Sequence, residues 1–439
     1  MKEISNSWLE NNKKDYLNDD KLNVLRRCLV KNPISESMYV LERESEDSFM
    51  FSIDIPTMPV TDQKQSGRCW IFAGLNVLRE IIGKKFNIDN FEFSQSYVAF
   101  YDKLEKVNFA LEKLIELRKK EEDDRVLLWI LDGGIADGGQ WDMFVNIIEK
   151  YGLVSKNAML ETFISGSTRE VNYFVNALIR KFNQEVRECK NINQARELKE
   201  KTMKEVYNLL TTCYGVPPSE FNFEYVDKNK EYHIQKGITP KEFYKNYVGD
   251  TLKDYVSIIN APTKDKPFNK CYTVDYLGNV IEGKSIKYLN LELNEFKEVI
   301  LNQLKDREVV WFGSDCARYG DRSKGIWDDK LFSYNQGFGI NFDLTKESSL
   351  VNRHSAMNHA MVLTGVNLDN EIPTRWKIEN SWGDKVANRG YYICSDSWFD
   401  RFVYQAVVNK KYLTKKQSDM LKGKVTHLNP WDPMGTLAD

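Results

Sequence analysis

The stretch QKQSGRCW, residues 63–70, marks the place where a loop is expected to become a helix. Before it stands IPTMP, residues 55–59, whose prolines exclude a helix. After it, Leu75, Leu78 and Ile82 recur at helical spacing. Cys69 is therefore predicted at a helix N-terminus, where partial positive charge and unpaired N–H groups favour a thiolate. The alternative is a small buried apolar residue, the usual fate of a free cysteine.

Two later stretches favour a catalytic role for Cys69. NHAMVLTGV, residues 358–366, places His359 at the start of an apolar, strand-like run. KIENSWG, residues 377–383, contains Asn380. A nucleophile followed by His and then by Asn is the chain order of the Cys–His–Asn triad in papain-like proteases.

The residues around this set resemble the papain family. GRCW at 67–70 is similar to the papain-type Gly-Ser-Cys-Trp, and NSWG at 380–383 is similar to the family's asparagine motif. Gln63 lies six residues before Cys69, where that family keeps its oxyanion-hole glutamine. The resemblance is closest to a cytosolic branch, the bleomycin hydrolase and aminopeptidase C family. It rests on QSGRCWIF at 65–72, DGGQWDM at 137–143 and PWDPMG at 430–435, and so extends over nearly the whole chain.

The resemblance implies an α+β, papain-like, two-lobed cysteine peptidase core with helical insertions and terminal arms. The interval from Cys69 to His359 is 290 residues, against about 130–150 in papain and cathepsins, so long insertions are expected. The expected segments are an N-terminal arm at 1–60, a helical lobe with the catalytic Cys at 61–215, a connecting insertion at 216–290, a β-rich lobe with His and Asn at 291–415, and a C-terminal arm at 416–439 that enters the cleft.

Local patterns predict the elements of these segments. Helices are expected after Cys69, along an amphipathic pattern from Ser94 to Arg125, and at 141–150, 171–186 and 194–210. Strands are expected at 309–312, 360–366, 376–379, 390–394 and 402–408. The N-terminal arm has one short helical pattern, on Leu22, Leu25 and Leu29. The tail, with Pro430, Pro433 and Gly435, is expected to be extended and not helical.

Composition excludes several classes of protein. The chain has 439 residues, of which 42% are hydrophobic and 13% aromatic, enough for a large core. Its 64 acidic and 62 basic residues nearly cancel, which makes a nucleic-acid partner unlikely on charge alone. The N-terminus has no apolar signal region, and no apolar run approaches the ~20 residues of a membrane helix.

Cysteine and histidine usage predicts a cytoplasmic protein without metal or other cofactor. The seven cysteines form no C-x-x-C pair, and four scattered histidines have no metal-ligand spacing. Secreted papain relatives have a disulfide-forming cysteine three residues before the nucleophile, where this chain has Ser66. His354 is the weaker candidate for the catalytic base, and His233 and His427 are expected to be exposed.

Each site residue has an expected role. A His359 imidazolium stabilises the thiolate and protonates the leaving amine, and Asn380 orients the imidazole. The side-chain amide of Gln63 and the N–H of Cys69 are the oxyanion donors. Trp382 shields the His–Asn hydrogen bond from water, or is only a core aromatic. Gly138 and Gly139 are expected to pair with the substrate backbone, because glycine permits close approach, or to form a plain turn.

The resemblance predicts a cysteine aminopeptidase that acts on peptides through a thioester acyl-enzyme. Bleomycin-hydrolase-like activity is a further expectation from the same resemblance. It implies a homohexamer and a C-terminal arm that fills the cleft on the side before the scissile bond. There the carboxylate of Asp439 would meet the α-ammonium of the substrate. Two alternatives stay open: a papain-like scaffold with a mainly binding role, such as a nucleic-acid-binding ring, and an acyl transferase.

Overall fold

Helix α5 (Cys69–Lys85) lies at the centre of the computed structural model, which describes residues 2–46 and 48–438. It contacts strands β7 (Val310–Ser314) and β10 (His359–Asp369) as well as the neighbouring helices. Most of its side chains from Cys69 to Gly83 are buried, as expected of a helix that is apolar on nearly all sides. The nucleophile candidate therefore begins the central helix of the core.

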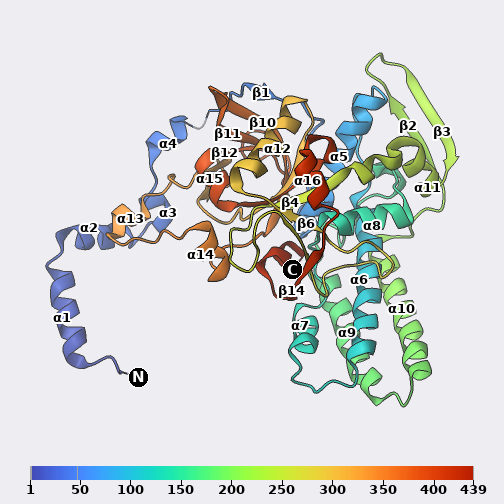
Figure 1. Ribbon diagram of the computed structural model, residues 1–439, viewed down its shortest axis with the longest axis horizontal. Helices are drawn as coiled ribbons and strands as arrows, with labels where there is room; N and C mark the ends of the chain where they lie inside the picture. Colours follow the sequence, from blue (N-terminus) through green and yellow to red (C-terminus); the bar gives the residue numbers. More distant parts are fainter. Residues whose placement is uncertain (1, 47, 439) are drawn as a thin grey trace.

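The helical lobe covers one side of α5 (Figure 1). Three of its long helices, α6, α9 and α10, pack on one another. The amphipathic pattern predicted from Ser94 to Arg125 is divided, because α6 ends at Leu117 and Asp124 then caps the next helix by accepting the N–H groups of Val126 and Leu127. The elements of this lobe are α6 (Gln95–Leu117), α7 (Arg125–Gly133), α8 (Trp141–Tyr151), η1 (Lys156–Ala158), α9 (Arg169–Glu188) and α10 (Ile192–Tyr214).

The connecting segment that follows contains a hairpin that the sequence patterns did not predict individually. Strands β2 and β3 form a separate two-stranded antiparallel sheet that extends from the body (Figure 1). The elements here are β2 (Phe221–Val226), β3 (Tyr232–Ile238), α11 (Pro240–Phe243), η2 (Tyr244–Val248), η3 (Gly249–Asp254), β4 (Tyr255–Ile259), β5 (Lys270–Val274) and β6 (Tyr288–Asn290).

The β-rich lobe is built on one twelve-stranded sheet, in the order β14-β5-β6-β4-β13-β7-β10-β11-β12-β9-β8, with β1 (Ile53–Asp54) paired to β10. Most pairs are antiparallel, and each predicted strand overlaps one of β7 and β10 to β13. The further elements are α12 (Leu293–Lys305), β8 (Gly320–Asp321), β9 (Ile326–Trp327), α13 (Tyr334–Phe338), α14 (Lys346–Val351), β11 (Ile372–Glu379), β12 (Tyr391–Ser395), α15 (Asp396–Phe402), β13 (Val403–Asn409), η4 (Lys410–Tyr412) and α16 (Lys415–Met420).

The N-terminal arm extends away from the body (Figure 1). Its described residues form four helices, whereas the sequence patterns predicted one, and the predicted leucine stripe falls on the second helix and its C-cap, Leu29. The first two have no buried residue. The four are α1 (Asn6–Leu17), α2 (Asp20–Cys28), α3 (Ile34–Ser37) and α4 (Leu41–Glu46).

The C-terminal tail returns to the middle of the molecule. Strand β14 (Val425–Leu428) pairs in parallel with β5, and the 3₁₀-helix η5 (Pro433–Ala438) follows. The prediction of an extended, non-helical tail was therefore wrong for its last residues. Pro433 stands at the first position of η5, where the missing N–H of proline has no intrahelical partner to lose.

In the described parts of the chain, none of the helices combines the length and the apolar character that crossing a bilayer requires.

Candidate active site

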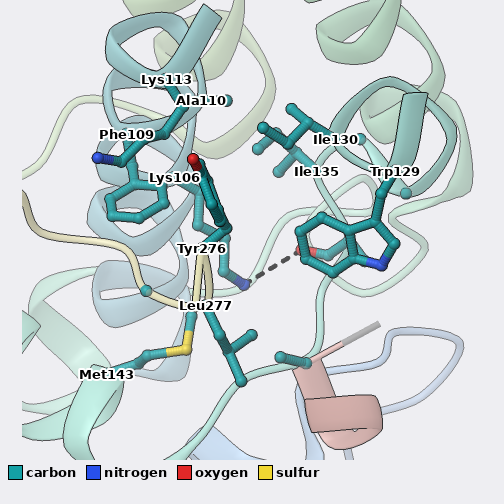
Figure 2. Close-up of a pocket in the computed structure, with 15 residues that line it drawn as sticks. Lys106, Phe109, Ala110, Lys113, Trp129, Ile130, Ile135, Met143, Tyr276 and Leu277 are labelled. Atoms are coloured by element: carbon teal, nitrogen blue, oxygen red, sulfur yellow. Dashed lines mark hydrogen bonds between the residues drawn. The ribbon is translucent and has the colours of Figure 1, made fainter. Parts of the chain in front are cut away.

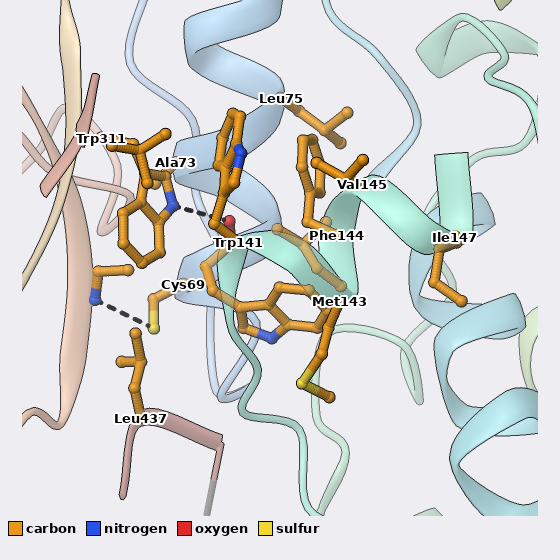
Figure 3. Close-up of a cluster of buried hydrophobic side chains, with 14 of the residues drawn as sticks. Cys69, Ala73, Leu75, Trp141, Met143, Phe144, Val145, Ile147, Trp311 and Leu437 are labelled. Carbon is orange, nitrogen blue, oxygen red and sulfur yellow. Dashed lines mark hydrogen bonds between the residues drawn. The ribbon is translucent and has the colours of Figure 1, made fainter. Parts of the chain in front are cut away.

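The candidate nucleophile lies against the strand that begins with His359. Cys69 is the first residue of α5 and only 4% exposed. Its Sγ accepts a hydrogen bond from the N–H of Ala360 at 3.4 Å (Figure 3). Burial raises the pKa of the Cys69 thiol to about 11, more than the neighbouring N–H groups lower it. The N–H groups of Cys69 and Trp70 at the helix N-terminus lower the pKa of the thiol, as expected, but burial outweighs their effect.

The structure joins the two other predicted triad residues directly. Nε2 of His359 donates to Oδ1 of Asn380 at 2.8 Å, and the same oxygen accepts the N–H of Ser381. Because a carbonyl oxygen only accepts, the proton of the neutral ring is on Nε2, and Nδ1 is left as the acceptor. Burial lowers the pKa of His359 to about 4, against the opposing effect of the Asn380 hydrogen bond.

Trp382 covers the imidazole. Its ring stacks on that of His359, with centroids 4.8 Å apart and planes 27° apart. Trp327 and Tyr392 also contact Trp382, so the same side chain belongs to the aromatic core. The two roles considered for this tryptophan are therefore compatible.

Gln63 bridges the loop before the nucleophile and the asparagine segment. Its Nε2 donates to the carbonyl of Ser66 at 2.6 Å, and its Oε1 accepts the hydroxyl of Ser381 at 2.7 Å. An amide nitrogen has two N–H groups, so one is left for a further acceptor. These contacts fix the side chain of Gln63 in a buried place beside the nucleophile loop.

The glycine loop contacts the C-terminal tail. The N–H of Gly139 donates to the carbonyl of Leu437 at 3.1 Å, and the carbonyl of Gly138 accepts Nζ of Lys106. A Cβ on Gly139 would lie 2.5 Å from the ring of Trp70. Only glycine fits there, and its backbone N–H is already bound to the C-terminal tail at Leu437.

Asp137 joins the glycine loop to the nucleophile loop. Its Oδ2 accepts the N–H of Gly67 at 2.9 Å, and its carbonyl accepts Nε1 of Trp70 at 2.7 Å. Its Oδ1 pairs with the buried ammonium of Lys103, which, with the hydroxyl of Thr168, holds the pKa of this carboxyl well below its usual range despite burial. Asp137 opens the DGGQWDM motif, but no local pattern in the sequence indicates this role.

An ion pair stands beside Ser66 in the nucleophile loop. Arg68 binds Glu161 through two parallel hydrogen bonds of 3.0 Å, and its Nε donates to Oγ of Ser66 at 2.9 Å. Two-point guanidinium–carboxylate contacts are geometrically demanding and strong. The pair therefore ties the nucleophile loop to the segment before α9 without a covalent bond.

The tail lies in the site. Leu437 is 3% exposed beside Cys69 (Figure 3), and Oγ1 of Thr436 donates to the carbonyl of Met357 at 2.8 Å. Ala438 borders a pocket lined by apolar and aromatic side chains of α6, α7 and the 276–278 segment, with Lys106 donating to the carbonyl of Ala136 at 3.2 Å (Figure 2). Asp439, the predicted partner of the substrate amine, lies outside the described residues.

The remaining histidines are separate from this group. His354 and His427 are exposed, the latter as expected, and the side chain of His233 is 40% exposed and contacts Asp227 at 3.2 Å. Asp227, Glu231 and His233 bring three ligand-type atoms within 4.8 Å on the β2–β3 turn. The N–H groups of Asn229 and Glu231 already bind the carboxylate of Asp227, as in an ordinary turn.

Three comparisons relate the chain to known proteins. The family described as the peptidase C1-like family matches residues 3–435. Aminopeptidase C from Listeria innocua is 47% identical over 439 residues, covering 100% of this chain and 98% of its relative. Aminopeptidase C from Lactobacillus delbrueckii subsp. lactis is 48% identical over 395 residues, 88% of each chain. The crystal structure of PepW from Lactobacillus rhamnosis superposes with a TM-score of 0.97 at 43% identity, covering 99% of both chains.

Proposed function

Because the chain belongs to the peptidase C1-like family and is a papain-like cysteine aminopeptidase, we propose that Cys69, His359 and Asn380 form its catalytic triad. The observation that carries the proposal is the 2.8 Å hydrogen bond from His359 to Asn380. His359 begins β10, and the next residue of this strand, Ala360, donates its N–H to the sulfur of Cys69. This bond leaves Nδ1 of the imidazole as the base.

The reaction proceeds through a thioester. His359 takes the proton of Cys69 as the sulfur attacks the carbonyl of the scissile bond, and the free N–H of Gln63 with the backbone N–H of Cys69 stabilises the oxyanion. Each such donor is typically worth about 2.7–4 kcal/mol. The imidazolium then gives its proton to the leaving amine, and His359 next activates a water that hydrolyses the thioester. The raised pKa of the Cys69 thiol and the lowered pKa of His359 mean that both are neutral before substrate binds.

The tail sets the specificity for free N-termini. The carbonyl of Leu437 accepts the backbone N–H of Gly139 that would otherwise bind an extended substrate. The tail therefore shortens the cleft on the side before the scissile bond. The terminal carboxylate of Asp439 then meets the α-ammonium of the substrate, a contact that N-acetylated peptides cannot make. Peptides are the substrate class, and bleomycin-hydrolase-like hydrolysis is a further activity of the same site.

The experiment is cleavage of a panel of free and N-acetylated peptides, with products identified by mass. The wild type removes single N-terminal residues from free peptides and spares acetylated ones. Cys69→Ala abolishes cleavage and keeps the fold. The control Cys28→Ala, which alters an exposed cysteine outside the site, keeps both cleavage and the fold. Cleavage by a pure Cys69→Ala preparation would contradict the mechanism.

The same assay separates the two alternatives. An added amine nucleophile forms a new amide product if the enzyme is an acyl transferase and leaves the products unchanged if it is a hydrolase. A binding scaffold, such as a nucleic-acid ring, would show no turnover at all. Assembly as a cytoplasmic homohexamer is part of the proposal, with the exposed helices of the N-terminal arm as contacts. Sedimentation at the monomer mass of 51.3 kDa would reject it.

A further inference from the structure

Three side chains form a stack that leads outward from the catalytic imidazole. The ring of Trp382 lies on that of His359, and the guanidinium carbon of Arg322 lies 4.0 Å from the centroid of the Trp382 ring. Arg322 is exposed and stands between the short strands β8 and β9. A guanidinium held on an aromatic face keeps its N–H edge turned sideways, available to another group.

The charge of Arg322 is not neutralised by a neighbour. Lys324, two residues on, pairs with Glu44, and Arg318 pairs with Asp315. The carboxylate of Asp321 accepts the N–H groups of Ser323 and Lys324. Among residues 2–46 and 48–438, no ion pair includes Arg322. Its guanidinium hydrogen-bonds the phenol of Tyr392, and its charge also acts on the imidazole of His359. The remaining N–H groups of the five on a guanidinium are left for another acceptor. An exposed cation without an ion-pair partner thus stands one ring, that of Trp382, away from the imidazole of His359.

The position of Arg322 relates it to one side of the scissile bond. The leaving amine receives its proton from His359, so the residues after the scissile bond leave past the imidazole. The segment before the scissile bond is confined by Leu437 and Gly139, beside Cys69. Trp382 and Arg322 therefore lie on the route of the leaving group.

We propose that Arg322 binds a carboxylate on the leaving-group side of the scissile bond and thereby favours substrates that carry one there. The ligand chemistry is a carboxylate, either the C-terminal carboxylate of a dipeptide or an acidic side chain just after the scissile bond. The proposal rests on the aminopeptidase mechanism and adds to it a specificity that acts on the outgoing fragment. Two N–H groups of a guanidinium match the two oxygens of a carboxylate.

The test compares three substrates that share an N-terminal leucine. Leucyl-alanine has a C-terminal carboxylate, leucyl-alaninamide has none, and the α-amide of leucyl-glutamate has only the side-chain carboxylate. The readout is the ratio of kcat/KM for each acidic substrate to that for leucyl-alaninamide. The ratio removes any effect of Arg322 on the pKa of His359, because that effect acts on all three substrates. Hydrolysis of leucyl-alaninamide, which has no carboxylate, tests the underlying aminopeptidase mechanism separately. This hydrolysis should be lost in Cys69→Ala.

The expected result is a ratio above one in the wild type for at least one acidic substrate. Arg322→Ala lowers this ratio about twofold to fivefold, the range of an exposed charge pair, and Arg322→Glu lowers it further. Arg322→Lys keeps part of the preference for the acidic substrate, and added salt lowers the ratio of the wild type. The matched control is Lys324→Ala, which removes a cation from the same turn and keeps the wild-type ratio. Equal ratios in the wild type and Arg322→Ala for both acidic substrates would overturn the proposal.

Discussion

Arg79 and Glu379 form a buried ion pair, with 2.9 Å between Nη2 and Oε1, that joins the helix of the nucleophile to the strand before Asn380. Asn76, on the same helix, donates to the same carboxylate oxygen at 2.8 Å. Both side chains of the pair are almost fully buried, 2% and 1% exposed. Two residues of α5 thus hold Glu379, whose chain neighbour is Asn380, in a fixed place relative to Cys69.

Removing one partner of this pair is expected to destabilise the protein strongly. Arg79→Met leaves the carboxylate of Glu379 buried without its cation, which typically costs about 3–5 kcal/mol. Urea unfolding measures the loss, and Lys84→Met, which removes an exposed cation from the same helix, serves as the control with a change within about 0.5 kcal/mol. Adding Glu379→Gln to Arg79→Met should recover part of the loss. Equal unfolding midpoints for Arg79→Met and the control would show that the pair is dispensable.

The pH dependence should follow the imidazole. Because the base is the neutral ring, kcat/KM falls as pH drops through the pKa of His359, about 4. Asn380→Asp places a carboxylate beside Nε2, stabilises the imidazolium and moves this acid limb to higher pH. The measurement is the rate of leucine p-nitroanilide hydrolysis against pH, with circular dichroism to confirm folding. An acid limb that stays in place in Asn380→Asp would contradict the assignment.

The same pKa also has a consequence for stability. The folded pKa of His359 lies below its unfolded value of about 6.5. Between these two values the unfolded chain binds a proton that the folded one does not. His359 therefore lowers the free energy of unfolding as pH falls from about 6.5 to about 4 and contributes no pH dependence above this window. His359→Gln, compared with the wild type by urea unfolding at pH 7 and pH 5, should lose less stability on acidification.

Asp137→Asn should impair catalysis by loosening two loops. The substitution leaves the buried ammonium of Lys103 without its carboxylate and weakens the acceptor for the N–H of Gly67. We expect a loss of about 3–5 kcal/mol in unfolding free energy and a lower kcat. Asp132→Asn changes an exposed aspartate at the end of α7 and should behave like the wild type. A fully active, equally stable Asp137→Asn enzyme would refute the role of this side chain in joining the loops.

Deleting residues 435–439 should change the mode of cleavage. Without Leu437 the N–H of Gly139 is free for a substrate backbone, and the cleft is open before the scissile bond. The truncated enzyme is expected to cut N-acetylated and internal bonds, detected by mass spectrometry. Truncated Cys69→Ala controls for a contaminating protease. If the truncated enzyme still removes only single residues and still spares acetylated peptides, the tail does not set the specificity.

The sequence predicted those features that depend on local pattern. The helix that starts at Cys69 and the strand that starts at His359 are visible as apolar periodicity beside a marker residue. The hydrogen-bonding role expected of Asn380 followed from chain order and resemblance, and its oxygen does accept from His359.

The missed features depend on residues far apart in the chain. Burial raises the pKa of the Cys69 thiol, and the residues around it include Leu437, 368 positions later in the chain. No local pattern reveals this effect. Asp137 and Glu379 depend on partners that are distant in the chain, among them Lys103 on α6 and Arg79 on α5. Arg322 is an ordinary exposed arginine until the fold brings it onto Trp382.

The pairing of β14 with β5, together with the guanidinium of Arg125 held 3.5 Å from the ring of Trp431, makes the last residues a ligand tethered to its own receptor. A short tether of this kind keeps its end at an effective concentration of about millimolar, whatever the amount of enzyme present. Dilution therefore cannot empty the cleft. A free peptide with the sequence of the removed segment would have to reach millimolar levels before it restored the original behaviour to the truncated enzyme.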